Sequence, residues 1–115
     1  LLKVMPGQIV FVNSSAGLGA RAGVGQYSAT QHAVRAMTDA LRAEINPYQI
    51  RVLSVFPGRT ATPRQERLYA EQQRDYQPEL LMQPEDVAVM ISAALRLPRT
   101  AEVTDISMRP LLKSY

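Results

Sequence analysis

Apolar and polar residues change period along this chain of 115 residues, and each change predicts where a strand or a helix lies. Gln8 to Asn13 is apolar on both faces, which is typical of a strand inside a parallel sheet covered by helices. A small, glycine-rich loop follows from Ser14 to Gly25. From Gln26 to Ile45, apolar residues recur at intervals of three and four, which predicts a helix. The apolar positions of this helix are Ala33, Met37, Ala40, Leu41 and Ile45.

The second half of the chain repeats this alternation. Ile50 to Phe56 is a β-branched segment that predicts a strand, and Pro57-Gly58 ends it. Pro84-Glu85-Asp86 predicts a helix start, because proline suits the first turn and acidic residues favour the positive end of the helix dipole. The expected buried stripe of this helix is Val87, Met90, Ile91, Ala94 and Leu95. Glu102 to Met108 alternates, with Val103 expected to face opposite to Ile106, as in a half-exposed strand.

The order strand–helix–strand–lid–helix–strand predicts an α/β fold with a parallel sheet and right-handed crossovers. Residues 63–76 are polar, charged and only loosely periodic, and we interpret them as a mobile helix or a lid. A doubly wound, Rossmann-like sheet has about six strands, so three strands predict one half of such a sheet. We therefore expect residues 1–115 to form a single partial domain. The start at Leu1-Leu2-Lys3, without methionine, also suggests a fragment.

Composition narrows the function classes. The net charge is +3, but arginines are scattered and interleaved with acidic residues, which argues against a nucleic-acid surface. The longest apolar run, Ile9 to Val12, is far shorter than the ~20 residues that cross a bilayer, so we expect no membrane span. With no cysteine and no secretory signal, we expect a cytoplasmic protein. His32 is the single histidine and has no carboxylate pair at ligand spacing, so no metal site is expected.

Ser14, Tyr27 and Gln31 are the most informative residues for function. Tyr27 follows Ser14 by thirteen residues, and Gln31 lies one helical turn beyond Tyr27 on the same face. The segments that contain them, Ile9-Val10-Phe11-Val12-Asn13-Ser14-Ser15-Ala16-Gly17 and Tyr27-Ser28-Ala29-Thr30-Gln31, resemble the short-chain dehydrogenase/reductase family. In that family a serine closes a strand, and a Tyr-x-x-x-Lys motif opens the next helix. The resemblance continues through Ile50-Arg51-Val52, Pro57-Gly58, Thr62 and Pro84-Glu85-Asp86-Val87-Ala88, and it covers nearly the whole chain.

The resemblance implies an NAD(P)-dependent oxidoreductase that acts on a small-molecule alcohol or carbonyl substrate. It makes Tyr27 the general acid/base, and it makes Ser14 the residue that holds the substrate oxygen. Tyr27 and Gln31 would also contact the cofactor, together with Pro57, Gly58 and Thr62 at its nicotinamide end.

The same resemblance implies features beyond the catalytic residues. Residues 63–82 would form the family's variable substrate lid. The family's glycine-rich phosphate loop would lie upstream of Leu1, so the chain would be the C-terminal half of a doubly wound, Rossmann-like sheet, without the N-terminal nucleotide-binding half. The ending Asp105 to Pro110 is similar to the branch that often uses NADP, which slightly favours NADP over NAD. Family members pair through helices equivalent to Gln26–Ile45, so a homo-oligomer is implied for the full-length form.

Gln31 departs from the family pattern, because the family has a lysine in its place. A free tyrosine has a pKa near ~10, and a nearby cation can lower the pKa of a tyrosine by roughly one to three units. Gln31 brings an amide donor but no charge. His32 faces away on the helix, Arg35 lies two turns further along, and Lys3 and Lys113 are near the chain ends. The alternative interpretation is therefore a catalytically inactive, truncated or degenerate family member that acts, if at all, as an interaction module.

Overall fold

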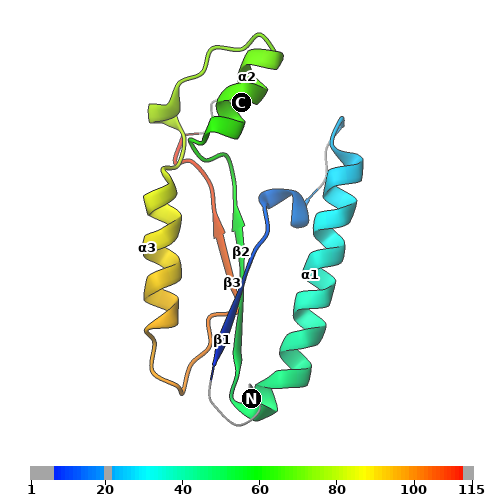
Figure 1. Ribbon diagram of the computed structural model, residues 1–115, viewed down its shortest axis with the longest axis vertical. Helices are drawn as coiled ribbons and strands as arrows, with labels where there is room; N and C mark the ends of the chain where they lie inside the picture. The colour runs from blue at the N-terminus through cyan, green and yellow to red at the C-terminus, as the bar shows by residue number, and fades with distance from the viewer. Residues whose placement is uncertain (1–6, 20–21, 113–115) are drawn as a thin grey trace.

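The computed structural model describes residues 7–19 and 22–112, which form three strands and three α-helices (Figure 1). In chain order the elements are β1 (Gln8–Val12), η1 (Ser15–Gly17), α1 (Gly25–Ile45), η2 (Asn46–Tyr48), β2 (Arg51–Pro57), α2 (Pro63–Glu71), η3 (Pro78–Leu80), α3 (Pro84–Leu95) and β3 (Asp105–Met108), where η marks a short 3₁₀ turn. The predicted starts of β1, α1, β2 and α3 agree with these bounds within one residue.

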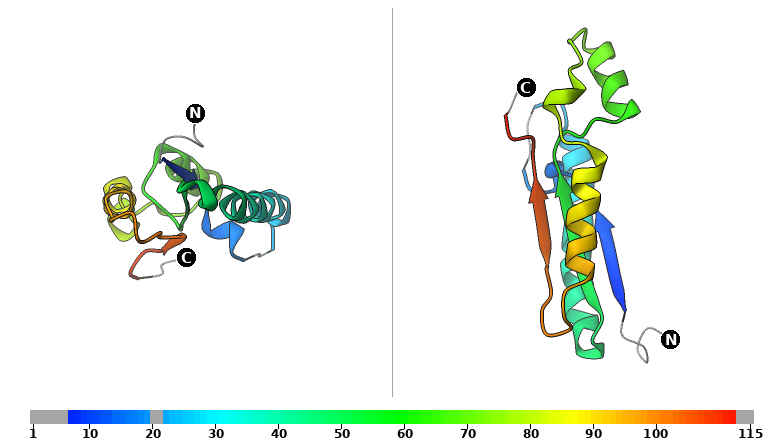
Figure 2. Two further views of the ribbon diagram at one scale, coloured as in Figure 1. Left: turned by 90° about the horizontal axis from the view of Figure 1, so that it is seen from below. Right: turned by 90° about the vertical axis from the view of Figure 1, so that its left-hand side faces the viewer.

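The three strands form one parallel sheet in the order β1-β2-β3. Ile9 pairs with Val52 across the first strand pair, and Val55 pairs with Ile106 across the second. Viewed along the strands, the sheet lies between α1 on one face and α3 on the other (Figure 2). This arrangement confirms the predicted α/β class and places β2 at the centre, with six of its seven residues buried. No helix in the described part of the chain is long and apolar enough to cross a membrane.

The face of the sheet beneath α3 is apolar. Leu53, Val55 and Ile106 form a buried cluster there. Partly buried residues that pack against this cluster are Val10, Val87, Ile91, Ala94, Val103 and Met108. The prediction for Met90 was wrong, because its side chain is 44% exposed. The opposed orientation expected for Val103 was also wrong: β3 begins only at Asp105, so strand alternation does not extend back to Val103.

The face of the sheet beneath α1 combines two buried apolar residues, Val52 and Phe56, with polar contacts to the helix. The buried residues of α1 are Ser28 and Thr38, and the guanidinium of Arg35 lies 5.1 Å from the ring centre of Phe56. The predicted helix is confirmed, but its apolar positions are only partly covered: Met37 is 72% exposed, Ala33 and Ala40 are exposed as well, and Leu41 and Ile45 are half-buried. Helical periodicity identifies an apolar face but not the partner that covers it, and the described part of the chain supplies no cover for this one.

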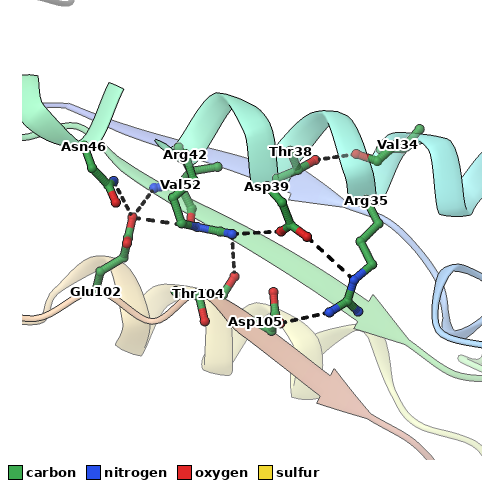
Figure 3. A network of polar contacts seen from close by, with 10 residues as sticks. All are labelled: Val34, Arg35, Thr38, Asp39, Arg42, Asn46, Val52, Glu102, Thr104 and Asp105. Carbon is green, nitrogen blue, oxygen red and sulfur yellow. Dashed lines mark hydrogen bonds and ion pairs between the residues drawn. The ribbon is translucent and has the colours of Figure 1, made fainter. Parts of the chain in front are cut away.

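A network of hydrogen bonds and ion pairs connects α1 to β2 and to the segment that leads into β3 (Figure 3). Arg42 donates from Nε to the carbonyl of Val52 at 3.0 Å and from a terminal nitrogen to the carbonyl of Thr104 at 2.9 Å. The carboxylate of Glu102 accepts from the backbone N–H of Val52 at 2.8 Å. Arg35 also pairs with Asp105 at 3.6 Å. These directed contacts fix the position of α1 along the strand as well as its distance from the sheet.

A second arginine, Arg51, is buried at the amino end of β2. Its guanidinium donates to the side-chain oxygen of Gln8 at 2.6 and 3.0 Å. It also donates to four backbone carbonyls after and at the end of α3, those of Leu95, Leu97, Pro98 and Ala101, at 2.8 to 3.1 Å. Arg51 therefore connects β1 and the segment at the end of α3 to the central strand β2. These contacts lie at the end of the sheet opposite to the candidate site.

Candidate active site

The predicted site residues gather at the carboxyl ends of the strands, where open α/β sheets bind their ligands. Ser14 follows β1, and Pro57-Gly58 closes β2. The backbone N–H of Asn13 donates to the carbonyl of Val55 at 2.7 Å, which continues the strand pairing up to the residue before Ser14. The ends of β1 and β2 therefore meet at one edge of the sheet, beside the first turns of α1.

Ser14 has an extended backbone conformation, with φ −152° and ψ 169°, and caps the 3₁₀ turn η1. Its Oγ accepts from the backbone N–H of Ala16 at 3.1 Å. This bond uses an acceptor position and leaves the hydroxyl proton available for donation. Ser14 can therefore still donate to an oxygen atom of a ligand.

Tyr27 lies in the first turn of α1, and its side chain is 38% exposed. The guanidinium of Arg64, from the first turn of α2, lies 5.6 Å from the centre of the Tyr27 ring. Within the described residues, no hydrogen bond joins the hydroxyls of Tyr27 and Ser14. Sequence reasoning missed Arg64. Its place two residues after Thr62, at the start of the expected lid, was the only available signal.

Gln31 is held by a residue that the sequence did not single out, Asn13. Nε2 of Gln31 donates to Oδ1 of Asn13 at 2.8 Å, and Nδ2 of Asn13 donates to the backbone carbonyl of Gln31 at 3.0 Å. Oδ1 of Asn13 also accepts from the backbone N–H of Ser14 at 2.7 Å. Lys3 and Lys113 lie outside the described residues.

Pro57, Gly58 and Thr62 form the turn that leads from β2 into α2. The backbone N–H of Gly58 donates to the carbonyl of Met108 at 2.7 Å, and a Cβ at position 58 would lie 3.3 Å from the same oxygen. A larger residue would therefore push β2 and β3 apart at the edge of the site. Thr62 caps α2, because its Oγ1 accepts from the backbone N–H of Gln65 at 3.2 Å.

The expected lid, residues 63–82, contains α2 and η3 and packs around Tyr69, which is buried. Arg59 donates to the Tyr69 hydroxyl at 2.8 Å, and the guanidinium of Arg74 lies 5.0 Å from the ring centre. Tyr76 meets the same ring edge-on, with 5.5 Å between ring centres. Parallel pairing of Thr60 with Met82 joins the two ends of the segment. Residues 63–82 are thus an ordered unit with its own aromatic centre.

These residues are chemically compatible with a nicotinamide nucleotide. The Gln31 amide has two N–H donors and uses one of them on Asn13, so one donor remains for a hydroxyl of the ligand. Thr62 uses its oxygen as an acceptor and keeps its hydroxyl proton. The Gly58 backbone lies at the strand edge without a side chain to block a close approach. Gln31 and Thr62 therefore each keep a neutral hydrogen-bond donor for a ligand.

Comparison with known proteins identifies relatives of this chain and of its fold. Residues 1–73 match the family model described as short chain dehydrogenase. A short-chain type dehydrogenase/reductase of Sinorhizobium fredii, y4eK, is 33% identical over 107 residues, covering 90% of this chain and 43% of that protein. The chain thus spans less than half the length of this curated relative.

Solved structures share the architecture. An alcohol dehydrogenase from the archaeon Thermococcus sibiricus, complexed with 5-hydroxy-NADP, is 23% identical with a TM-score of 0.77, over 99% of this chain and 46% of that chain. A short-chain dehydrogenase from Mycobacterium paratuberculosis, bound to NAD, is 26% identical with a TM-score of 0.67, over 90% of this chain and 44% of that chain. With the fold, the family-model match and the y4eK similarity in agreement, the chain belongs to the short-chain dehydrogenase family of oxidoreductases.

Proposed function

We propose that this chain carries the catalytic half of an NAD(P)-dependent oxidoreductase that interconverts an alcohol and a carbonyl compound. The observation that carries the proposal is the link from Asn13 to Gln31, which joins the residue before Ser14 to the helical turn after Tyr27. It holds the end of β1 against the start of α1, so the two hydroxyl-bearing residues of the family pattern share one edge of the sheet. The proposal extends to the whole protein, whose relatives are more than twice as long as this chain.

In this proposal Tyr27 is the general acid/base. Its hydroxyl gives a proton to the substrate oxygen during carbonyl reduction and takes it back during alcohol oxidation. Ser14 donates a hydrogen bond to the same oxygen and keeps it within reach of Tyr27. The partial exposure of Tyr27 supports this role, because a substrate must reach the phenol.

A bound nicotinamide would supply the hydride donor or acceptor for this reaction. Gln31, Thr62 and the Pro57-Gly58 turn are the residues that we assign to its nicotinamide end, with Tyr27 beside them. Two solved neighbours contain NAD and an NADP derivative, which supports the cofactor class. We keep a slight preference for NADP, from the ending Asp105 to Pro110.

The lid and the uncovered face of α1 complete the proposal. Residues 63–82 would cover a small-molecule substrate above Tyr27, with Arg64 as the lid residue that contacts its ring. The exposed apolar face of α1, with Met37 at its centre, supports pairing with another helix in a homo-oligomer. A cytoplasmic location also remains part of the proposal.

Tyr27→Phe tests the proposal, because it removes only the phenolic oxygen. In the whole protein, with NADPH or NADH and a panel of small ketones and aldehydes, we expect kcat to fall by roughly 10² to 10⁴. Tyr48→Phe is the matched control, since Tyr48 lies in η2 at the opposite end of α1. Equal turnover by the wild-type protein and Tyr27→Phe would refute the assignment of Tyr27.

A further inference from the structure

The carboxamide of Asn13 is almost fully engaged at the candidate site. Asn13 is 7% exposed, and its Oδ1 accepts from both the backbone N–H of Ser14 and Nε2 of Gln31. Its Nδ2 donates to the backbone carbonyl of Gln31. One short side chain therefore binds the proposed substrate-holding residue and the residue in the place of the family lysine.

This network also determines which way both amides face. The backbone N–H of Ser14 can only donate, so the atom of Asn13 that it meets must be the oxygen. The Asn13 nitrogen then faces the Gln31 carbonyl, which can only accept. Since Oδ1 of Asn13 needs a donor, the Gln31 atom beside it must be the nitrogen. The backbone thus fixes the orientation of the Gln31 side chain through Asn13.

Gly17 closes the space around this amide from the other side. A Cβ at position 17 would lie 2.7 Å from Oδ1 of Asn13 and 3.0 Å from its Cγ and Nδ2. These distances are shorter than van der Waals contact, so a side chain at position 17 would displace the Asn13 amide. Gly17 therefore offers a way to move Asn13 without removing it.

We propose that Asn13 is a positioning residue, which holds one N–H of Gln31 so that the second is presented to a hydroxyl of the nicotinamide ribose. This inference rests on the proposed function. It assigns the uncharged Gln31 a defined part in cofactor binding, and it makes that part depend on Asn13. A glutamine without such a partner would keep its rotational freedom and would lose entropy on each binding event.

A double-mutant cycle in the whole protein tests the inference through the KM for the cofactor. Gln31→Met keeps the length of the side chain and removes its hydrogen bonds. We expect Asn13→Ala and Gln31→Met each to raise this KM about tenfold, the effect of losing about one hydrogen bond. Because both changes remove the same contact, the double variant should match either single one. If Asn13→Ala raises the KM for the cofactor by the same factor in the Gln31→Met background as in the wild-type protein, the inference is overturned.

A second readout does not depend on turnover. In the NMR spectrum of the protein without cofactor, the Gln31 side-chain amide should give one slowly exchanging proton, and Asn13→Ala or Gly17→Ala should abolish its protection. Rapid exchange of both protons in the wild-type protein would overturn the inference. If Asn13→Ala fails to fold, Gly17→Ala carries the same two measurements. Asn13→Asp is then the conservative control, because it keeps the acceptor oxygen and should leave the Gln31 amide proton protected.

Asn46→Ala is the matched control, because Asn46 is also a hydrogen-bonded asparagine but lies at the far end of α1, bonded to Ile50 and Glu102. It should lower the melting temperature without changing the KM for the cofactor. The failures of the two proposals are distinguishable. An unchanged KM in Asn13→Ala, with Tyr27→Phe still inactive, would refute the positioning role alone, whereas normal turnover by Tyr27→Phe would refute the proposed function.

Discussion

The two faces of the sheet are built from different kinds of contact. Under α3, the contacts are between the apolar cluster of the sheet and apolar side chains of the helix, such as Val87 and Ile91. Under α1, hydrogen bonds and ion pairs are added to the buried side chains of Val52 and Phe56, and the single side chain of Arg42 reaches two backbone carbonyls (Figure 3). Apolar contacts depend little on direction, whereas hydrogen bonds weaken steeply when distances or angles change. The helix that these directional contacts hold is α1, which carries Tyr27 and Gln31. The position of α1 is therefore closely defined, as the proposed chemistry requires.

The largest change in stability is expected on the face of the sheet beneath α3. Leu53→Ala removes buried methyl groups from the cluster under α3, and we expect it to lower the free energy of unfolding by about 2–5 kcal/mol. Chemical denaturation measures this change. Val12→Ala is the control, because Val12 is an exposed strand residue, and its loss should cost much less. Similar losses in both variants would mean that the α3 face is not the main apolar core.

A smaller loss of stability is expected from removing polar contacts beneath α1. Arg42→Met keeps much of the side-chain stem but removes the guanidinium, and we expect a loss of about 1.5–3 kcal/mol in the free energy of unfolding. The resistance of α1 to trypsin, or the protection of its amides from hydrogen exchange, should fall more than that of α3. Arg67→Met, a change of an exposed arginine on α2, is the control and should be nearly neutral. Equal loosening of both helices would contradict the division of roles between the faces.

The smallest effect concerns two buried serines, Ser28 of α1 and Ser54 of β2. Among the described residues, the hydroxyls of Ser28 and Ser54 are buried without a hydrogen-bond partner. We expect Ser54→Ala to leave the melting temperature unchanged or to raise it slightly, because an unpaired hydroxyl is costly to bury. The contrasting variant is Thr38→Val, which removes a hydroxyl bonded to the carbonyl of Val34 at 2.7 Å and should cost about 1 kcal/mol. A large loss in Ser54→Ala would reveal a partner for its hydroxyl.

Much of the fold could be predicted from local patterns. Strand and helix starts follow from proline, glycine and apolar periodicity, which act over a few neighbouring residues. The orientation of α1 could not be predicted, because Met37 lies on an apolar face whose partner is not in the described part of the chain. The start of β3 at Asp105 was also missed, since alternation around Val103 looks the same before and inside a strand.

The candidate site also has one part that the sequence could predict and another that it could not. The spacing of Ser14, Tyr27 and Gln31 could be found by resemblance, and the structure places Ser14 and Tyr27 near the ends of neighbouring elements. The amide of Asn13 was missed because its partner Gln31 is eighteen residues away, and no local pattern reports such a pair. The contact of Arg64 with Tyr27 was missed for the same reason, since it depends on how the lid folds back.

Arg51 and the arginines of residues 63–82 differ in accessibility, with a consequence for limited proteolysis. Arg51 has its guanidinium locked among carbonyl oxygens, and its peptide bond lies within the central strand. Arg64, Arg67 and Arg74 are exposed on and just after α2. Trypsin needs a free side chain and an extended backbone around it, so cleavage should begin in residues 63–82. The sheet and its two covering helices should persist as the resistant part after residues 63–82 have been cut.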